Sequence, residues 1–184
     1  MANEQYGFYV DTSRCVICWG CEIACKQWHG IKAGTHSRRK VEIATEGLFP
    51  DTKQIFTSLS CMHCATPLCV VVCPEGAISK REEDGIVVID TDLCTGCGTC
   101  RTNCPFEVPE IIQLEEADGT MRPVSDKCDA CLSLGRQPDE DTHCVATCPL
   151  GALHFGPLSE MGAMATERGG ALMEGTTVPS VYIS

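Results

Sequence analysis

Short stretches in which apolar and polar residues alternate recur along the chain and predict short β-strands. Residues 6–11 form the first such stretch and predict a single strand. Residues 41–45 and 54–59 also alternate, and the segment between them contains Gly and Pro, which predicts a β-hairpin. Residues 77–80 and 86–90 flank an acidic turn that ends in glycine, and they predict a second hairpin.

The chain has no apolar stretch long enough for a membrane-spanning helix. Such a helix needs roughly 18–20 apolar residues, whereas the best runs here, 70–72 and 86–89, have the length of a strand. We therefore expect no direct membrane span. Residues 1–5 contain neither a basic nor an apolar segment, so we expect no export signal of the chain's own. From residue 157 onward the sequence is rich in Gly, Met, Ala and Thr and lacks cysteine, which predicts a C-terminal arm.

Composition changes this picture, because cysteine is far more frequent than in ordinary soluble domains. Sixteen of the 184 residues are cysteine, whereas only five Phe, two Trp and three Tyr are present. We therefore expect something other than side-chain packing to fill part of the interior. The formal net charge of −11 argues against a phosphate-binding surface, so nucleic acid is not an expected partner.

The cysteines fall into four groups of four with none left over. The first and third groups have the spacing Cys-x2-Cys-x2-Cys-x3-Cys, which is the bacterial ferredoxin spacing for [4Fe–4S] ligation. In chain order the groups are Cys15, Cys18, Cys21 and Cys25; Cys61, Cys64, Cys69 and Cys73; Cys94, Cys97, Cys100 and Cys104; and Cys128, Cys131, Cys144 and Cys148. We therefore predict four [4Fe–4S] clusters, with iron as the metal bound by all sixteen cysteines.

Two other uses of cysteine fit this pattern less well. Disulfide frameworks are typical of short secreted domains with a signal peptide, and this chain is neither short nor preceded by one. The Cys61/Cys64 and Cys128/Cys131 pairs look like halves of a four-cysteine zinc site. Three cysteines at steps of three residues in one loop favour a cubane instead.

The last two cysteines of every group are four residues apart, which places both sulfur atoms on one side of a short helix. In two-cluster ferredoxins the fourth cysteine binds the neighbouring cluster, so we expect each helix to connect two clusters. Pro74, Pro105 and Pro149 follow the fourth cysteine in the later three groups and predict that the helix ends there. The first group has Lys26 in that place, so its helix is expected to continue through Trp28.

The chain also contains an internal duplication. Residues 11–15 resemble residues 90–94, and residues 73–78 resemble residues 148–153. We therefore predict an α+β fold of tandem bacterial-ferredoxin-like units, with two pseudo-symmetric lobes of two [4Fe–4S] clusters each, irregular loops and the C-terminal arm. The predicted division is lobe A, 1–60 and 107–158; lobe B, 61–106; and the arm, 159–184.

The order and spacing of the four groups resemble the four-cluster iron–sulfur electron-transfer (beta) subunits of the dimethyl sulfoxide reductase family of molybdopterin oxidoreductases. The resemblance covers about residues 5–158 and includes a second group that ends in Cys-Pro and a fourth group with a long gap. The most similar segments are Gln5-Tyr6-Gly7-Phe8-Tyr9-Val10-Asp11, Cys61-Met62-His63-Cys64, Cys73-Pro74-Glu75-Gly76-Ala77-Ile78 and Lys127-Cys128-Asp129-Ala130-Cys131.

The resemblance implies which cysteines share a cluster, because in that family the first group pairs with the fourth and the second with the third. Carried over to this sequence, the implied ligands are Cys15, Cys18, Cys21 and Cys148 for cluster 1; Cys128, Cys131, Cys144 and Cys25 for cluster 2; Cys61, Cys64, Cys69 and Cys104 for cluster 3; and Cys94, Cys97, Cys100 and Cys73 for cluster 4. Some relatives, such as nitrate reductase, have tryptophan at the position of Cys97 and carry a three-iron cluster, so the cysteine here implies four irons.

No other residues form a catalytic constellation, so we expect the reaction itself to occur on a partner. The resemblance implies an electron-transfer subunit of anaerobic respiration. It would relay electrons between a quinol-side or soluble donor and a large molybdopterin (Mo or W) catalytic subunit, with a membrane anchor subunit as a further candidate partner. The alternatives are a polyferredoxin component of a hydrogenase or formate dehydrogenase complex, and a zinc-binding interaction module. The cellular side stays open between the cytoplasm and export of the folded chain with a signal-bearing partner, attached to the membrane through the anchor.

Several further residues adjoin the ligands in sequence. Trp19 is interpreted as a shield of the first cluster, and residues 38–40 as a solvated basic face. Because the cysteine sets are complete, we expect His63 and His143 at the surface or beside the ligands rather than on iron. The glycines expected to let backbone N–H groups approach cluster sulfur are Gly20, Gly96 and Gly98.

Overall fold

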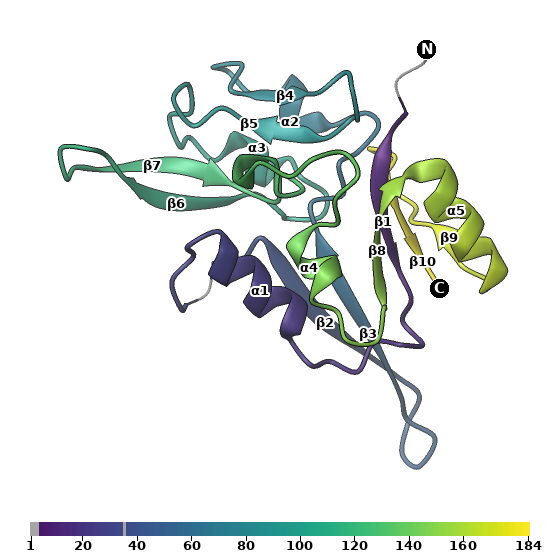
Figure 1. Cartoon of the computed structure of the whole chain (residues 1–184). Coiled ribbons are helices and arrows are strands. Elements are labelled where there is room, and N and C mark those ends of the chain that lie inside the picture. The colour runs from purple at the N-terminus through teal and green to yellow at the C-terminus, as the bar shows by residue number, and fades with distance from the viewer. Residues whose placement is uncertain (1–3, 35) are drawn as a thin grey trace.

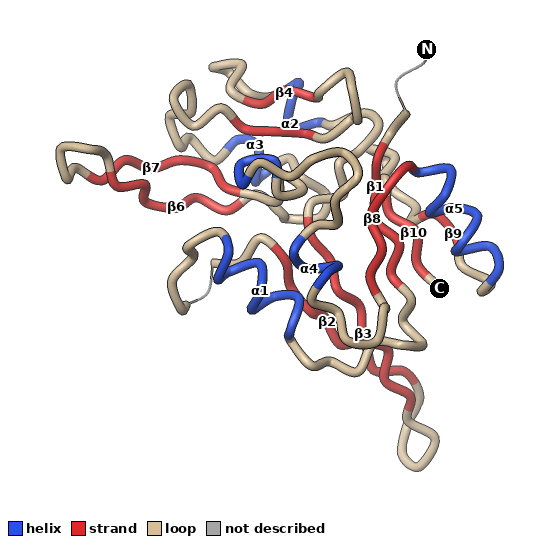
Figure 2. The backbone as a smooth tube through the Cα atoms, viewed as in Figure 1, coloured by secondary structure: helices blue, strands red, loops and turns tan. Residues whose placement is uncertain are grey.

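The computed structural model describes residues 4–34 and 36–184 as short strands and helices connected by long loops (Figure 1; Figure 2). The strands are β1 (Tyr6–Val10), β2 (Arg39–Glu46), β3 (Lys53–Ser60), β4 (Ile78–Lys80), β5 (Val87–Ile89), β6 (Glu110–Glu115), β7 (Met121–Asp126), β8 (Leu153–Pro157), β9 (Ala171–Leu172) and β10 (Val181–Ile183). The helices are α1 (Gly20–Trp28), α2 (Leu68–Val71), α3 (Thr99–Thr102), α4 (His143–Ala146), α5 (Leu158–Glu167) and the 3-10 turn η1 (Leu132–Leu134). In these two ranges no helix is both long and apolar enough to cross a membrane. The expectation about an export signal in residues 1–5 falls mostly outside the described residues.

A four-stranded sheet brings the first and last strands of the chain together. Its strand order is β8-β1-β10-β9, with β1 antiparallel to β8 and parallel to β10. The strand predicted at 6–11 is confirmed as β1. Its period of two residues places Phe8 and Val10 in the main core and Tyr9 in a second cluster on the opposite face.

The segment from residue 158 to 184 folds against this sheet. Helix α5 packs Met161 and Ala165 against Tyr9, and β10 pairs with β1 (Figure 1). The sequence led us to expect an arm here, whereas the segment contributes a helix and two strands to the body of the molecule. The pattern did not reveal this, because β10 has only three residues and its partner lies at the other end of the chain.

Three two-stranded antiparallel hairpins surround the cysteine groups. Both predicted hairpins are confirmed as β2–β3 and β4–β5, and the first is longer than predicted, because Arg39 already pairs with Ser60. The third hairpin, β6–β7, was not predicted. Pro123 lies within β7 and cannot donate a backbone hydrogen bond, so the sequence did not predict a strand in this segment.

Each cysteine group contains the start of a short helix. Helices α2, α3 and α4 have four residues each and contain the third cysteine of their group, and the fourth cysteine follows after the helix has ended. Helix α1 continues to Trp28, as the absence of a proline predicted. Helix α1 contacts α4, and α2 contacts α3. The first group therefore lies beside the fourth and the second beside the third, while the two-lobe symmetry stays a prediction.

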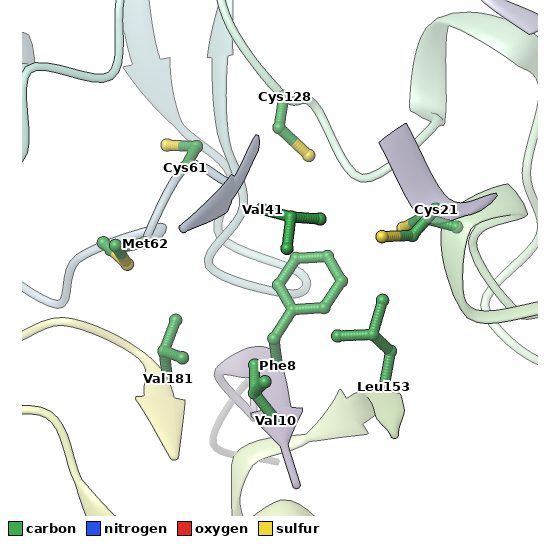
Figure 3. Packing of buried hydrophobic residues seen from close by; sticks show 10 residues of the cluster. Phe8, Val10, Cys21, Val41, Cys61, Met62, Cys128, Leu153 and Val181 are labelled. Atoms are coloured by element: carbon green, nitrogen blue, oxygen red, sulfur yellow. The ribbon is translucent and has the colours of Figure 1, made fainter. Parts of the chain in front are cut away.

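Cysteine side chains occupy much of the interior. The main core combines them with residues from the sheet and from β2, and Figure 3 shows Cys21, Cys61 and Cys128 arranged around Val41 and the Phe8 ring. Its buried members are Phe8, Val10, Cys21, Val41, Cys61, Met62, Cys128, Cys144, Leu153 and Val181. Buried cysteine is common in soluble proteins, but here cysteines of three of the four groups meet in one core.

Candidate metal centres

The sixteen cysteines are free thiols, and we divide them into four sets, each of which combines cysteines of two groups. We define set 1 as Cys15, Cys18, Cys21 and Cys148; set 2 as Cys25, Cys128, Cys131 and Cys144; set 3 as Cys61, Cys64, Cys69 and Cys104; and set 4 as Cys73, Cys94, Cys97 and Cys100. These are the four groupings that the family resemblance implied, and the assignment of each cysteine to its set stays a prediction. Whether each set binds iron stays a prediction.

Sets 1 and 4 each line a cavity. The cavity at set 1 has apolar walls that include Val10, Val41 and Leu153. The cavity at set 4 is closed by Ile78 and by Ser125 of β7. In residues 4–34 and 36–184 no three His, Cys, Asp or Glu side chains converge on a point where one metal ion would sit. The thiols of these two sets instead surround a space.

Sets 2 and 3 are recognised by the mutual electrostatic effects of their thiols. Burial raises the pKa of the Cys25 thiol, and Cys128, Cys144 and Cys131 raise it further. Burial likewise raises the pKa of Cys69 to about 12, with added contributions from Cys61, Cys104 and Cys64. In each case the three thiols that act on the fourth belong to its own set.

The donor chemistry of the sets fits an iron–sulfur cluster. Thiolates are the form that binds metal, yet burial and mutual repulsion oppose deprotonation of four neighbouring thiols. Bound iron offsets this repulsion and keeps the sulfur atoms deprotonated. Four cysteines are also the usual ligand number of a [4Fe–4S] cluster.

The backbone adopts the same unusual conformation in all four cysteine groups. The residue two positions after the first cysteine of each group is left-handed: Ile17 (φ 54°), His63 (φ 43°), Gly96 (φ 68°) and Ala130 (φ 54°). Left-handed residues in such turns direct successive backbone N–H groups toward one point and form anion-binding concavities, which are found at many iron–sulfur sites. Three of the four residues are not glycine, so this geometry is kept despite its steric strain.

The three glycines expected to lie close to sulfur differ in their backbone conformation. Gly96 and Gly98 have positive φ, in agreement with the expectation, whereas Gly20 begins helix α1. Trp19 takes the position equivalent to Gly98 and is also left-handed, with φ 61°. Its side chain is 42% exposed and lines the cavity of set 1, which supports its interpretation as a shield.

Hydroxyl groups lie at hydrogen-bond distance from a cysteine sulfur in every set. The pairs are Ser58 Oγ and Cys21 Sγ (3.2 Å), Thr142 Oγ1 and Cys144 Sγ (3.2 Å), Thr177 Oγ1 and Cys64 Sγ (3.1 Å), and Ser125 Oγ and Cys100 Sγ (3.2 Å). Backbone N–H groups add to them, since the N–H of Ser125 donates to Cys94 Sγ at 3.3 Å. When the thiolates bind metal, these hydroxyls become donors to sulfur and stabilise the more negative, reduced state.

Sequence reasoning missed these hydroxyl residues. The available signal was in β3, where the alternating pattern places Ser58 and Ser60 on the buried side of the strand. A polar residue at an inward position needs a buried partner, and here Ser58 has a thiol. Thr177 carried no such signal, because only the folding of the C-terminal segment brings it to Cys64.

The basic stretch at 38–40 is not a solvated face, so that interpretation was wrong. Arg39 is 1% exposed. Arg38 is mostly buried and pairs with Asp126 (2.7 Å) and Asp129 (3.4 Å), and Lys40 pairs with Glu110. Strand β2 pairs with β3, and Asp126 and Asp129 face Arg38 just before that strand, so two of the three cations at 38–40 face protein rather than water.

Both histidines lie beside ligands. His63 is fully buried, burial lowers its pKa well below the usual range, and its Nδ1 accepts a hydrogen bond from the Val87 N–H at 3.1 Å. The His143 ring stacks on Trp28 with 4.1 Å between ring centroids. His63 is thus a neutral side chain next to Cys64. His143, the first residue of α4, packs against the last residue of α1.

Comparison with known proteins agrees with this geometry. The family model of the 4Fe-4S dicluster domain matches residues 52–158, more than half of the sequence. The B component of the anaerobic dimethyl sulfoxide reductase of Escherichia coli K12 is 41% identical over 169 residues, which cover 86% of this chain and 77% of that protein. The probable anaerobic dimethyl sulfoxide reductase component YnfG of the same strain is 42% identical over the same coverage. Protein NrfC of that strain is 35% identical over 156 residues, covering 85% and 67%.

Proposed function

Because the protein belongs to the family of iron–sulfur electron-transfer subunits represented by the B component of anaerobic dimethyl sulfoxide reductase, we propose that it relays electrons through four [4Fe–4S] clusters to a molybdopterin catalytic subunit. The bound clusters supply the one-electron redox chemistry. The residues of the protein hold the clusters, exclude water from them and adjust their potentials.

The observation that carries the number of clusters is the repeated loop. All four cysteine groups have a left-handed residue at the same position, and every cysteine belongs to one of the four sets. A protein with two clusters would have no use for the other two concavities. We therefore propose sets 1 to 4 as the ligands of clusters 1 to 4.

The packing supports a linear order of the four clusters. Cysteines of sets 1, 2 and 3 contribute to the main core, and a smaller core contains Cys69 of set 3 with Cys73 and Cys100 of set 4. Of the sixteen cysteines, Cys18 and Cys97 are exposed, and they belong to sets 1 and 4. We place the entry and exit of electrons at these two ends, since sets 2 and 3 contain no exposed cysteine.

The proposed main partner is a large molybdopterin subunit, because two of the similar proteins are named as components of dimethyl sulfoxide reductases. A separate anchor subunit on the quinol side, and export of the folded protein with its partner, extend this proposal. Co-purification tests it. We expect a large molybdenum- or tungsten-containing protein to accompany this one from its natural host, and its consistent absence from gently prepared material would contradict the proposal.

Metal and sulfide analysis tests the cluster count. Protein prepared without oxygen should contain about sixteen iron and sixteen acid-labile sulfide per molecule, four of each per cubane. Zinc without sulfide would contradict the proposed function, and about eight iron would contradict the number of clusters. A brown colour with broad visible absorption should accompany the iron.

A further inference from the structure

Arg39 is the largest fully buried side chain among the described residues. It begins strand β2, and its guanidinium lies over the Phe8 ring with 4.5 Å from Cζ to the ring centroid. An arginine remains charged in every protein environment. The core of this molecule therefore contains a permanent positive charge that the electron-transfer role alone does not explain.

The protein itself supplies only neutral acceptors for this charge. Arg39 Nη1 donates to the Ser58 carbonyl (3.0 Å) and lies 3.2 Å from Ser58 Oγ, and Nη2 donates to Ser60 Oγ (3.0 Å). Over residues 4–34 and 36–184, no carboxylate pairs with Arg39, and its buried Nε–H has no acceptor. Because an unpaired buried charge is strongly unfavourable, an anion is expected beside it.

Cysteines of two sets lie near Arg39 and become anionic groups when they bind metal as thiolates. The guanidinium lies over Phe8, and the main core around that ring contains Cys21 of set 1 together with Cys128 and Cys144 of set 2. Ser58 connects the two directly, since its hydroxyl lies 3.2 Å from both Arg39 Nη1 and Cys21 Sγ. The cation thus lies between two neighbouring sets rather than within one.

We propose that Arg39 is a buried counter-ion shared by the clusters of sets 1 and 2, that its free Nε–H donates to a sulfur atom there, and that it raises the reduction potentials of these clusters. A [4Fe–4S] cluster with four thiolates is an anion, and reduction adds one negative charge. A fixed cation in a dry interior therefore stabilises the reduced state more than the oxidised state. The inference rests on the proposed clusters and adds a residue that sets their potentials.

The test is a redox titration of the intact complex followed by electron paramagnetic resonance. Arg39→Met removes the charge and keeps an unbranched apolar side chain in its place. Lys40→Met is the matched control, because it removes a neighbouring charge that is exposed on the same strand. Arg39→Lys keeps the charge but loses the Nε–H donor and the planar geometry.

In Arg39→Met we expect the equilibrium constant for one-electron reduction to fall about tenfold at one or two of the four clusters, which corresponds to about 59 mV. Arg39→Lys should lower the same potentials by less, and Lys40→Met should leave all four unchanged. Unchanged potentials in Arg39→Met, or equal shifts at three or more clusters, would overturn the proposal.

If Arg39→Met does not retain its iron, Arg39→Gln decides the matter in the same way, since it also removes the charge but keeps a side chain that can form hydrogen bonds. A lowered potential at one or two clusters then supports the role of Arg39, and four unchanged potentials reject it. Failure of the proposed function looks different, because the unmodified protein would then lack clusters altogether. Clusters that are present but insensitive to residue 39 reject only the inference about Arg39.

Discussion

Single side chains control how strongly each cluster holds an electron. Ser125 offers the cleanest example, because among the described residues its hydroxyl contacts Cys100 Sγ and no other side chain. A neutral hydrogen bond contributes about 0.5–1.5 kcal/mol, and a tenfold change in the reduction equilibrium, about 1.4 kcal/mol, equals about 59 mV. We expect Ser125→Ala to lower the potential of one cluster by roughly 20–60 mV with full iron content. The measurement is a redox titration, with the exposed Ser79→Ala as control. A shift of equal size in both variants would argue against the hydrogen bond.

Cys97 gives a second prediction for a single residue. It is one of the two exposed cysteines and lines the cavity of set 4, so its loss should leave the other three sets undisturbed. We expect Cys97→Ser to convert one cluster into a three-iron cluster, with a new signal in the electron paramagnetic resonance spectrum of the oxidised protein. The total iron should fall by about one atom per molecule, since a cubane has four corners. Loss of every cluster from soluble, folded protein would contradict the division into sets.

The cysteine loops contain several residues with a left-handed backbone. Gly96 and Gly98 both have positive φ, but a Cβ at Gly96 would lie 2.5 Å from the Pro123 carbonyl oxygen, whereas one at Gly98 would meet nothing closer than 3.9 Å. Gly98→Ala should therefore cost about 1–2 kcal/mol from the left-handed backbone alone, a fall in Tm of roughly 2–8 °C. Gly96→Ala should cost clearly more. Thermal unfolding of the two iron-loaded variants checks this, and equal Tm values would show that β7 does not pack against the loop.

The helices and strands also show how much of the fold can be predicted from the sequence. Strand β1, two hairpins and the longer α1 were predictable, because local alternation and the absence of proline after Cys25 determine them. The four cysteine groups were predictable because cysteine spacing is a local property, whereas their division into sets came from the family resemblance and stays a prediction. Hairpin β6–β7, the folded C-terminal segment and the buried Arg39 were not predicted. Each depends on contacts between distant segments. A charged residue beside two other cations is expected at the surface when its neighbours in the fold are unknown.

At the level of the whole molecule, the cysteine sets hold together parts of the protein that are far apart in sequence. Set 1 joins the first group to Cys148, and set 3 joins the second group to Cys104. Removing iron leaves buried thiols without ligation, and metal-binding energy in such proteins is also folding energy. We expect anaerobic treatment with an iron chelator to abolish most of the secondary structure measured by circular dichroism. A sample stripped of nearly all its iron that still unfolds cooperatively would contradict this.

The central place of β1 in its sheet has a consequence for biosynthesis. Both neighbours of β1 in the sheet, β8 and β10, follow it by more than 140 residues, so β1 leaves the ribosome long before either of them. Until these strands have been translated, β1 has no partner strand, and the thiols of the first group follow it in the unfolded chain. Thr177 meets Cys64 only at that late stage as well. Under the proposed function, the first cluster is completed only after Cys148 of set 1 has been translated, so the thiols of the first group must stay reduced until then.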